Sequence, residues 1–343
     1  MSTHQIQLIT RDGQSLSFDC ADSEDLISAA ARASIHLPAL CKGGGCGACR
    51  ASCTDGDYHL GETSREALSD QARGRGEVLL CRTYADGDLA IAAPFDHAHI
   101  SFQPVPERTG RVSALTQIGG NTVRLVVQYD EDPELGVAAQ FEPGQYVELI
   151  VPESGLTRAY SLANTANWDG RLEFLIRLHP TGQFSAWLRD TAATGSAIGV
   201  RGPQGAFVLQ DNGTRPRIFV AGGTGLAPML SMLSRMAEYG ESNPCRLVFG
   251  VTRASDLFAL DDIERLKRAL PALSVDIRLW EGGGDAGTQP GTPVEGLKHC
   301  LNDAPQADIY LCGPPAMIDA AEQVALAAGV PAARIFSERF LPT

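Results

Sequence analysis

Short apolar runs at the start of the chain predict a β-hairpin followed by a helix. Residues 6–9 and 16–18 form these runs, and an Asp-Gly pair within residues 11–14 is a strong hairpin turn signal between them. Apolar residues then recur at helical spacing over residues 26–33, and Asp22 precedes them as a candidate N-cap.

Two further strand-like runs, at residues 78–80 and 89–91, follow in the first hundred residues. Together with the hairpin and the helix, they predict a small α+β domain. Pro104 and Pro106 then flank a single apolar residue, a composition typical of a short linker.

The middle of the chain carries a different pattern, in which strand-like runs follow one another. Residues 111–115, 122–127 and 146–151 are such runs, and a Gly-Gly-Asn turn separates the first two. The pattern extends from Gly110 to about Asn212 and predicts an all-β domain.

In the last third of the chain, buried strand-like runs alternate with helical stretches. The strand-like runs are residues 217–221, 247–251, 275–279 and 308–311, and the helical stretches are residues 229–236, 262–270 and 317–328. Such alternation predicts a doubly wound parallel sheet. We therefore expect three domains, at residues 1–98, 108–212 and 213–343, with a linker at residues 99–107.

Composition and charge narrow the functional classes. The chain has 343 residues, with 28 Lys and Arg against 41 Asp and Glu, and a formal net charge of −13. This charge argues against binding to nucleic acid or to an anionic membrane, and no apolar run approaches the length of a membrane-spanning helix. The first residues lack the basic and apolar regions of a secretory signal, so we expect a cytoplasmic, monomeric protein.

Four of the nine cysteines have the spacing of an iron–sulfur site. Cys41, Cys46 and Cys49 follow the pattern C-x4-C-x2-C, and Cys81 follows after a long gap, as in plant-type sites where four thiolates bind a [2Fe–2S] cluster. Glycines between the first three cysteines allow the backbone to approach a cluster closely. Cys53 lies outside the pattern, and we expect it to be a small buried hydrophobic residue.

Two other uses of cysteine are possible in principle. A disulfide framework requires an oxidising compartment and is usual in short secreted chains, neither of which fits this sequence. A structural zinc site usually has two C-x2-C pairs, and this stretch has one, which leaves zinc as the alternative.

The tetrapeptide Arg158-Ala159-Tyr160-Ser161 is similar to the flavin-binding signature of the ferredoxin–NADP reductase superfamily. The residue types suit that role, because Arg158 can pair bidentately with pyrophosphate and Tyr160, on the same strand face, can stack on an isoalloxazine ring. The hydroxyl of Ser161 can reach the flavin N5. In isolation, an Arg and a Tyr on a strand are more often a surface pair.

A second phosphate contact is predicted downstream, where a turn opens a short helix. A helix N-terminus presents free N–H groups and the positive end of the helix dipole. The residues that we assign to this contact are Arg177, Leu178, Gly182, Gln183, Phe184 and Ser185. Together the two motifs predict an FAD site in which Arg158 and Ser185 hold the pyrophosphate.

A glycine-rich turn between residues 217–221 and the helix at residues 229–236 predicts a dinucleotide site. Strand, glycine turn and helix form the arrangement that holds pyrophosphate at a helix N-terminus, although the pattern G-x-G-x-x-G is absent. We expect Gly223, Thr224 and Gly225 to bind the NADH phosphates. A glycine turn that serves packing alone is the alternative.

Two strand ends complete the predicted NADH site. Residues 308–311 lead into Cys312, Gly313 and Pro314, at the end of a parallel strand where ligands bind. Asp256, shortly after residues 247–251, could accept a hydrogen bond from the adenosine ribose 2′-OH and would repel a 2′-phosphate, which favours NADH over NADPH. An exposed loop carboxylate is the alternative interpretation of Asp256, and Arg253 nearby weakens the inference.

Taken together, these motifs resemble the one-chain NADH-dependent reductases of bacterial oxygenases over essentially all 343 residues. The resemblance implies a β-grasp ferredoxin domain, a β-barrel FAD domain and a doubly wound NAD domain. It also implies that Ser161 and Cys312 are catalytic, that Cys312 lies beside the nicotinamide, and that Phe340 lies near the flavin ring. The stretches most similar to reductases of soluble methane monooxygenases are residues 53–58, 80–84, 219–228, 308–315 and 338–342.

The combination predicts a path for electrons. NADH gives up two electrons at once and a [2Fe–2S] cluster takes one, so a flavin must stand between them. We expect electrons to pass from NADH to FAD, to the cluster, and to the di-iron hydroxylase of a soluble methane monooxygenase. Two alternatives are a reductase of another oxygenase, acting on phenols, alkenes or aromatic rings, and a non-enzymatic ferredoxin-like carrier.

Overall fold

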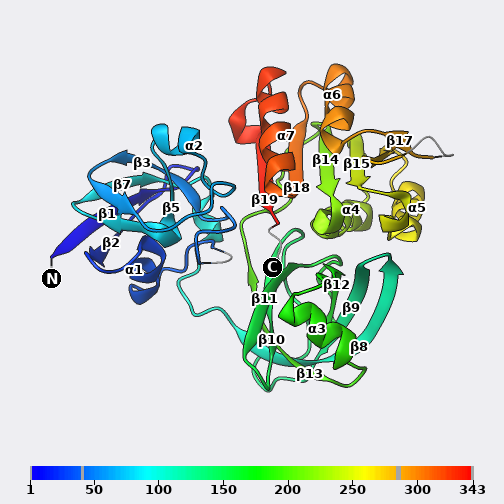
Figure 1. Ribbon diagram of the computed structural model, residues 1–343, viewed down its shortest axis with the longest axis horizontal. Helices are drawn as coiled ribbons and strands as arrows, with labels where there is room; N and C mark the ends of the chain where they lie inside the picture. Colours follow the sequence, from blue (N-terminus) through cyan, green and yellow to red (C-terminus); the bar gives the residue numbers. More distant parts are fainter. Residues whose placement is uncertain (1, 40–41, 283–286, 341–343) are drawn as a thin grey trace. The chain divides into compact units, whose positions relative to one another are not determined.

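The computed structural model describes residues 2–39, 42–282 and 287–340 (Figure 1). The chain divides into two compact units, one of residues 1–106 with 204–206 and one of residues 107–203 with 207–343. None of the helices in the described ranges combines the length and apolar content that a bilayer crossing needs.

The first unit contains a five-stranded mixed sheet that begins with the predicted hairpin. The sheet order is β2-β1-β7-β3-β5, and β1 is parallel to β7 while the other neighbours are antiparallel. The elements of the first unit are β1 (Thr3–Ile9), β2 (Ser15–Ala21), α1 (Leu26–Arg32), β3 (Arg50–Asp55), β4 (Tyr58–Leu60), α2 (Asp70–Gly74), β5 (Glu77–Leu79), η1 (Leu80–Arg82), β6 (Thr83–Ala85), β7 (Leu89–Ala92) and η2 (His97–His99). Ile6, Leu8 and Ile91 form the centre of its core with Leu26 of α1.

The prediction that Asp22 caps α1 is wrong. An N-cap at Asp22 requires the helix to begin at residue 23, but α1 begins at Leu26. Asp25 is the N-cap, and its Oδ1 accepts hydrogen bonds from the N–H groups of Ile27 and Ser28, both at 3.1 Å. Asp22 instead accepts from the N–H of Ser2 at 3.0 Å and contacts the His4 ring at 2.7 Å. A cap must lie directly before the first helical residue, and that position could not be fixed from apolar spacing alone.

In the second unit, residues 107–203 form an antiparallel barrel of six strands in the order β11-β10-β13-β8-β9-β12. Its elements are β8 (Glu107–Gly119), β9 (Thr122–Tyr129), β10 (Tyr146–Val151), β11 (Leu156–Ser161), β12 (Arg171–Arg177), α3 (Gln183–Asp190) and β13 (Ala197–Gln204). Beyond β11, the N–H of Ala163 donates to the carbonyl of Glu173 in β12 at 2.8 Å, which closes the barrel.

The remainder of the second unit is a six-stranded parallel sheet in the order β17-β16-β15-β14-β18-β19. Its elements are β14 (Arg217–Gly222), η3 (Gly223–Gly225), α4 (Leu226–Glu238), β15 (Cys245–Val251), η4 (Ala254–Asp256), α5 (Leu260–Ala269), β16 (Leu273–Leu279), β17 (Gln289–Pro290), α6 (Pro293–Asp303), β18 (Asp308–Gly313), α7 (Pro315–Ala327), η5 (Ala332–Arg334) and β19 (Ile335–Arg339).

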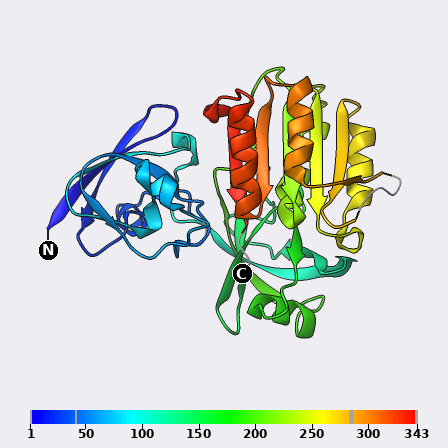
Figure 2. The same ribbon diagram turned by 45° about the horizontal axis from the view of Figure 1, so that its top comes forward.

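Alternate residues of β14 face opposite sides of this sheet. Phe219 and Ala221 pack with α4 and α5, whereas Ile218 and Val220 pack with α6 and α7. Figure 2 shows the orange α6 and the red α7 together in front of the sheet. The central strand is therefore apolar on both faces, as a doubly wound fold requires.

Replacement of Asp25 by Ala should loosen α1 without changing the rest of the sheet. Loss of an N-cap costs about 1 kcal/mol, which corresponds to roughly fivefold faster local opening. Hydrogen exchange of the full chain, measured on peptides that cover α1, checks this expectation. Asp22→Ala is the matched control, and equal acceleration in both variants would contradict the assignment of the cap.

Candidate functional site

The strand β11 carries the flavin-type signature at its C-terminal end. Arg158 and Tyr160 lie on the same face of the strand and both are partly buried. The ring of Tyr160 packs against that of Phe184 in α3, with centroids 5.2 Å apart at an angle of 47°. Burial raises the pKa of the Tyr160 phenol, so this ring stays neutral and suits an apolar stacking partner.

The start of α3 lies next to this strand and forms an open helix N-terminus. Gly182 is the N-cap residue and offers no side chain to the first N–H groups of the helix. Ser185 is buried, and its hydroxyl accepts a hydrogen bond from the N–H of His179 at 2.9 Å. Arg177 is exposed at the end of β12, and the N–H of Leu178 donates to Asn121 at 2.7 Å. Gln183 is exposed in the first turn, beside Phe184.

The glycine turn after β14 is packed directly against the end of β18. A Cβ at Gly225 would overlap the carbonyl oxygen of Cys312, so this position has no room for a side chain. Gly223 has φ 54, a left-handed conformation, and Thr224 between the two glycines is partly exposed. The turn thus lies at the carboxyl edge of the parallel strands, where ligands bind in such sheets.

A buried polar contact joins the two halves of the second unit. The hydroxyl of Ser161, the last residue of β11, donates to Oε2 of Glu338 in β19 at 2.9 Å. Both residues are buried. Burial raises the pKa of Glu338 from 4.5 to about 7, although the hydrogen bond from Ser161 partly opposes that shift. Cys312 is fully buried, and burial together with the nearby Glu338 raises the pKa of its thiol.

Glu338 is the residue that the sequence interpretation missed, although it lies in a stretch that was noticed. Its neighbour Phe340 was assigned to the site, and the N–H of Phe340 donates to the carbonyl of Gly313 at 2.8 Å. Phe340 is partly buried against the core that contains α4. Pro314 is exposed and precedes the first residue of α7. The short run after η5 carried too weak a strand signal to show that Glu338 points towards β11.

Asp256 lies at the end of η4, and its carboxylate is engaged within its own turn. Oδ2 of Asp256 accepts a hydrogen bond from the N–H of Arg253 at 3.2 Å. The Arg253 guanidinium contacts Glu281, after β16, at 2.7 Å. Asp256 and Arg253 are close in the sequence, so their proximity could be predicted. The contact of Arg253 with Glu281 could not be predicted, because no sequence motif links the two residues.

Three of the four predicted cluster cysteines can be placed, while Cys41 lies outside the described residues. Cys46, Cys49 and Cys81 are all buried, and the Sγ atoms of Cys49 and Cys81 are 3.3 Å apart. The N–H of Ala48 points at the Sγ of Cys46, at 3.5 Å. Cys53 is partly buried, packs against the core, and donates to the carbonyl of Asp55 at 3.3 Å.

The placed cysteines fit a two-iron group. A [2Fe–2S] cluster takes two thiolates per iron, and the close pair Cys49 and Cys81 matches that requirement. At Gly44, with φ 77, a Cβ would lie 2.6 Å from the carbonyl oxygen of Glu62, so the loop must stay free of side chains there.

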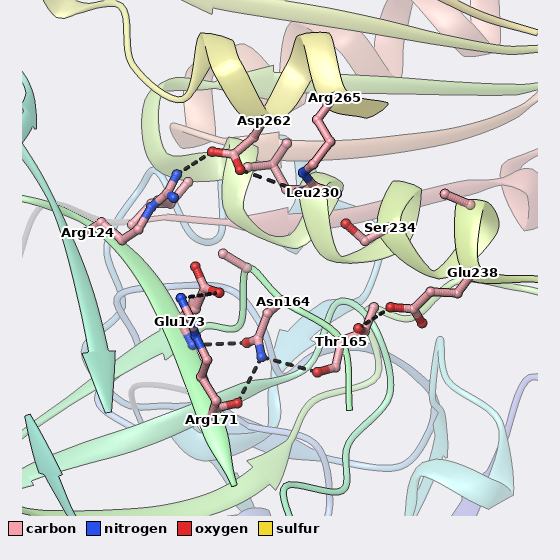
Figure 3. Close-up of a pocket in the computed structure, with 13 residues that line it drawn as sticks. Arg124, Asn164, Thr165, Arg171, Glu173, Leu230, Ser234, Glu238, Asp262 and Arg265 are labelled. Atoms are coloured by element: carbon pink, nitrogen blue, oxygen red, sulfur yellow. Dashed lines mark hydrogen bonds and ion pairs between the residues drawn. The ribbon is translucent and has the colours of Figure 1, made fainter. Parts of the chain in front are cut away.

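A polar cavity of about 590 Å³ lies between α4 and α5 on one side and β9 and β12 on the other (Figure 3). An ion pair between Arg124 and Asp262 crosses it, and Thr165 donates to Glu238 at 2.5 Å. None of the residues assigned to cofactors from the sequence lines this cavity. The cavity therefore lies at the interface between barrel and sheet, apart from the residues assigned to cofactors.

Comparison with known proteins matches all three parts of the chain. Residues 9–86 match the family model of the 2Fe-2S iron-sulfur cluster binding domain. Residues 109–209 match that of the oxidoreductase FAD-binding domain, and residues 219–323 match that of the oxidoreductase NAD-binding domain.

Relatives resemble the chain over most of its length. Methane monooxygenase component C of Methylosinus trichosporium is 38% identical over 86% of this chain and 86% of its own. The toluate 1,2-dioxygenase electron transfer component of Pseudomonas putida is 35% identical over 98% of each chain. The crystal structure of an Amycolatopsis cytochrome P450 reductase is 29% identical, with a TM-score of 0.72, and covers 98% of this chain and 99% of its own.

The three domains, their order and the full-length relatives agree with the geometry of the flavin-type strand, the glycine turn and the cysteine loop. The chain belongs to the ferredoxin reductase family, as an oxidoreductase with 2Fe-2S, FAD-binding and NAD-binding domains of the kind that carries electrons in oxygenase systems.

Proposed function

We propose that this chain is the NADH-dependent reductase that supplies the di-iron hydroxylase of a soluble methane monooxygenase. The NADH-dependent reductase activity is supported by the buried contact between Ser161 and Glu338 beside Cys312. This contact brings the flavin-type strand to the ligand edge of the parallel sheet. The 38% identity to methane monooxygenase component C supports the choice of acceptor.

In this proposal the barrel orients the flavin. Arg158 and the open N-terminus of α3, with Gly182, Gln183 and Ser185, hold the pyrophosphate, and Arg177 adds positive charge at the end of β12. Tyr160 would stack on the isoalloxazine, and Leu178 and Phe184 would contact the bound flavin from the barrel. When bound, FAD takes two electrons from NADH and releases them singly, and the cluster accepts one at a potential of about −400 mV.

The parallel sheet positions the nicotinamide. Gly223, Thr224 and Gly225 receive the phosphates, and Gly313 and Pro314 leave the end of β18 open for the ring. Phe340 would lie near the ring of the bound flavin. Cys312 packs beside the nicotinamide as a neutral thiol, since burial keeps it protonated.

The protonation state of Glu338 determines which hydrogen bonds the Ser161 hydroxyl can make. When Glu338 is ionised, the Ser161 hydroxyl donates to it and can only accept from a flavin N–H. When Glu338 is protonated, its own O–H can donate, which frees the Ser161 hydroxyl to donate elsewhere. The pair therefore adjusts its hydrogen bonds as the proton content of the site changes.

Another oxygenase is the second candidate acceptor. The toluate 1,2-dioxygenase electron transfer component matches more of this chain, 98% against 86%, at a slightly lower identity. NADH consumption with a panel of purified hydroxylases and dioxygenases separates the two candidates. Coupled turnover with an aromatic-ring dioxygenase and none with a di-iron hydroxylase would reject our choice.

Glu338→Gln should change how stability depends on pH. The native carboxyl, whose pKa is about 7, keeps a proton that the unfolded chain releases above 4.5. The contribution of Glu338 to stability is therefore fully present below that lower value and is lost, by on the order of 3 kcal/mol, as pH rises through 7. Gln is neutral and can still accept from Ser161, so the variant should melt at a higher temperature than wild type at about pH 8.5 but not at about pH 5.

Flavin fluorescence during thermal melting of the full chain measures this difference. The control is Glu322→Gln, which also removes a carboxylate, one that accepts from Ser337 at 2.6 Å and is only partly buried. An equal offset between Glu338→Gln and wild type at both pH values would show that Glu338 does not titrate in this range.

Cys46→Ser should separate flavin reduction from electron delivery. Loss of residues that merely support metal ligands costs roughly 10- to 100-fold in metal affinity or activity, and loss of a ligand should cost at least that. Reduction of the flavin by NADH should stay near the wild-type rate, because the barrel and the parallel sheet are unchanged. Stopped-flow absorbance and iron analysis measure the two effects.

Cys53→Ser is the matched control, because Cys53 lies in the same unit but outside the ligand pattern. It should retain both iron and delivery to the hydroxylase. Full delivery by Cys46→Ser, or loss of iron in both variants alike, would contradict the assignment of the ligands.

A further inference from the structure

Two adjacent strand ends carry an ion pair at the ligand edge of the parallel sheet. Arg253 follows β15 and Glu281 follows β16, and these strands are parallel neighbours. Nε of Arg253 lies 2.7 Å from Oε2 of Glu281. Both side chains are exposed, at 66% and 56%, so a ligand at this edge can reach them.

Asp256 belongs to the same group of charges but is less free than the other two residues. Its carboxylate accepts from the N–H of Arg253, and the turn is held further by the N–H of Gly120, which donates to the carbonyl of Ser255 at 3.1 Å. Arg253 contributes one positive charge, whereas Asp256 and Glu281 each contribute a negative one. Among the described residues, these three side chains therefore carry a net charge of −1 around the guanidinium of Arg253.

We infer that Glu281 is a specificity-determining residue that makes the chain select NADH over NADPH. It holds and neutralises Arg253, the one described cation of this charge group that could pair with a 2′-phosphate. The inference rests on the proposed function, since it assumes that the adenosine of NADH binds at the ends of β15 and β16.

The mechanism is electrostatic rather than steric. A 2′-phosphate carries close to two negative charges at neutral pH, and it would meet two carboxylates and an arginine that is already paired. A ribose 2′-OH carries no charge and can donate a hydrogen bond to a carboxylate. An exposed ion pair contributes little by itself, so the charge of Glu281 matters more than the strength of its bond to Arg253.

Nucleotide binding to the full holo-protein tests this inference without electron transfer. The two probes are 5′-AMP and adenosine 2′,5′-bisphosphate, which differ in the 2′-phosphate. Glu281→Gln should tighten binding of the bisphosphate by roughly tenfold at low salt and leave AMP unchanged, with a smaller gain at high salt. Calorimetric titration measures both dissociation constants.

Two further variants serve as controls for this experiment. Arg253→Gln combined with Glu281→Gln should lose most of the gain, because the released guanidinium is then absent. Glu264→Gln removes an equally exposed carboxylate, paired with Lys267 at 2.7 Å on α5, and should leave both constants unchanged. In parallel, the rate of flavin reduction by NADPH relative to NADH should rise in Glu281→Gln alone.

The possible negative results of these titrations contradict different parts of the inference. Normal AMP binding with no change in bisphosphate affinity in Glu281→Gln would overturn the role of Glu281 and leave the proposed function standing. A gain of the same size in Glu264→Gln, or one retained in the double variant, would overturn the role of the Arg253 pair. Failure of wild type to bind AMP at all would overturn the nucleotide site itself, and the proposed function with it.

Discussion

The hydrogen bond between Ser161 and Glu338 connects two elements that lie 177 residues apart. Both side chains are buried, so a small displacement of the barrel against the parallel sheet would leave a carboxyl group without its partner in an apolar environment. Such a loss costs more than an ordinary hydrogen bond is worth. This constraint keeps the flavin-type strand in register with the strand ends that surround Cys312.

Other polar contacts also join the barrel and the sheet. Ser231 of α4 donates to the carbonyl of Asn164 at 2.6 Å, and Arg124 pairs with Asp262 across the cavity. The apolar cores of the barrel and of the sheet form separate clusters, but Leu175 of β12 and Ile118 of β8 pack into the cluster of the sheet. Polar contacts have strict geometry, so they determine orientation where apolar packing would tolerate sliding.

Much of the fold could be predicted from local pattern because each class of element has its own period. The two-faced apolar runs of β14, β15 and β18 indicated a parallel sheet, and the glycine turn indicated where its ligand edge lies. The helix α6 was missed, although Thr292 and Glu295 form a capping box at its start. Its apolar residues are fewer than those of α4, so the periodic signal of a helix is weaker there.

The contacts of the candidate site that could not be predicted from the sequence depend on which strands are neighbours in the sheet. Arg253 and Glu281 are 28 residues apart, and they meet because β15 and β16 are neighbours in the sheet. Glu338 reaches Ser161 only because β19 is placed at the edge beside β18. Motifs such as Arg158-Ala159-Tyr160-Ser161 were visible because all their members lie on one strand.

The tight contact between Gly225 and Cys312 has an unequal effect on the two positions during evolution. The atom that excludes a side chain at residue 225 is a backbone carbonyl oxygen, which every amino acid at residue 312 would present. Residue 225 is therefore confined to glycine whatever its partner becomes. Residue 312 can exchange its thiol for another small group without disturbing the glycine turn, so sequence divergence at this edge can accumulate there.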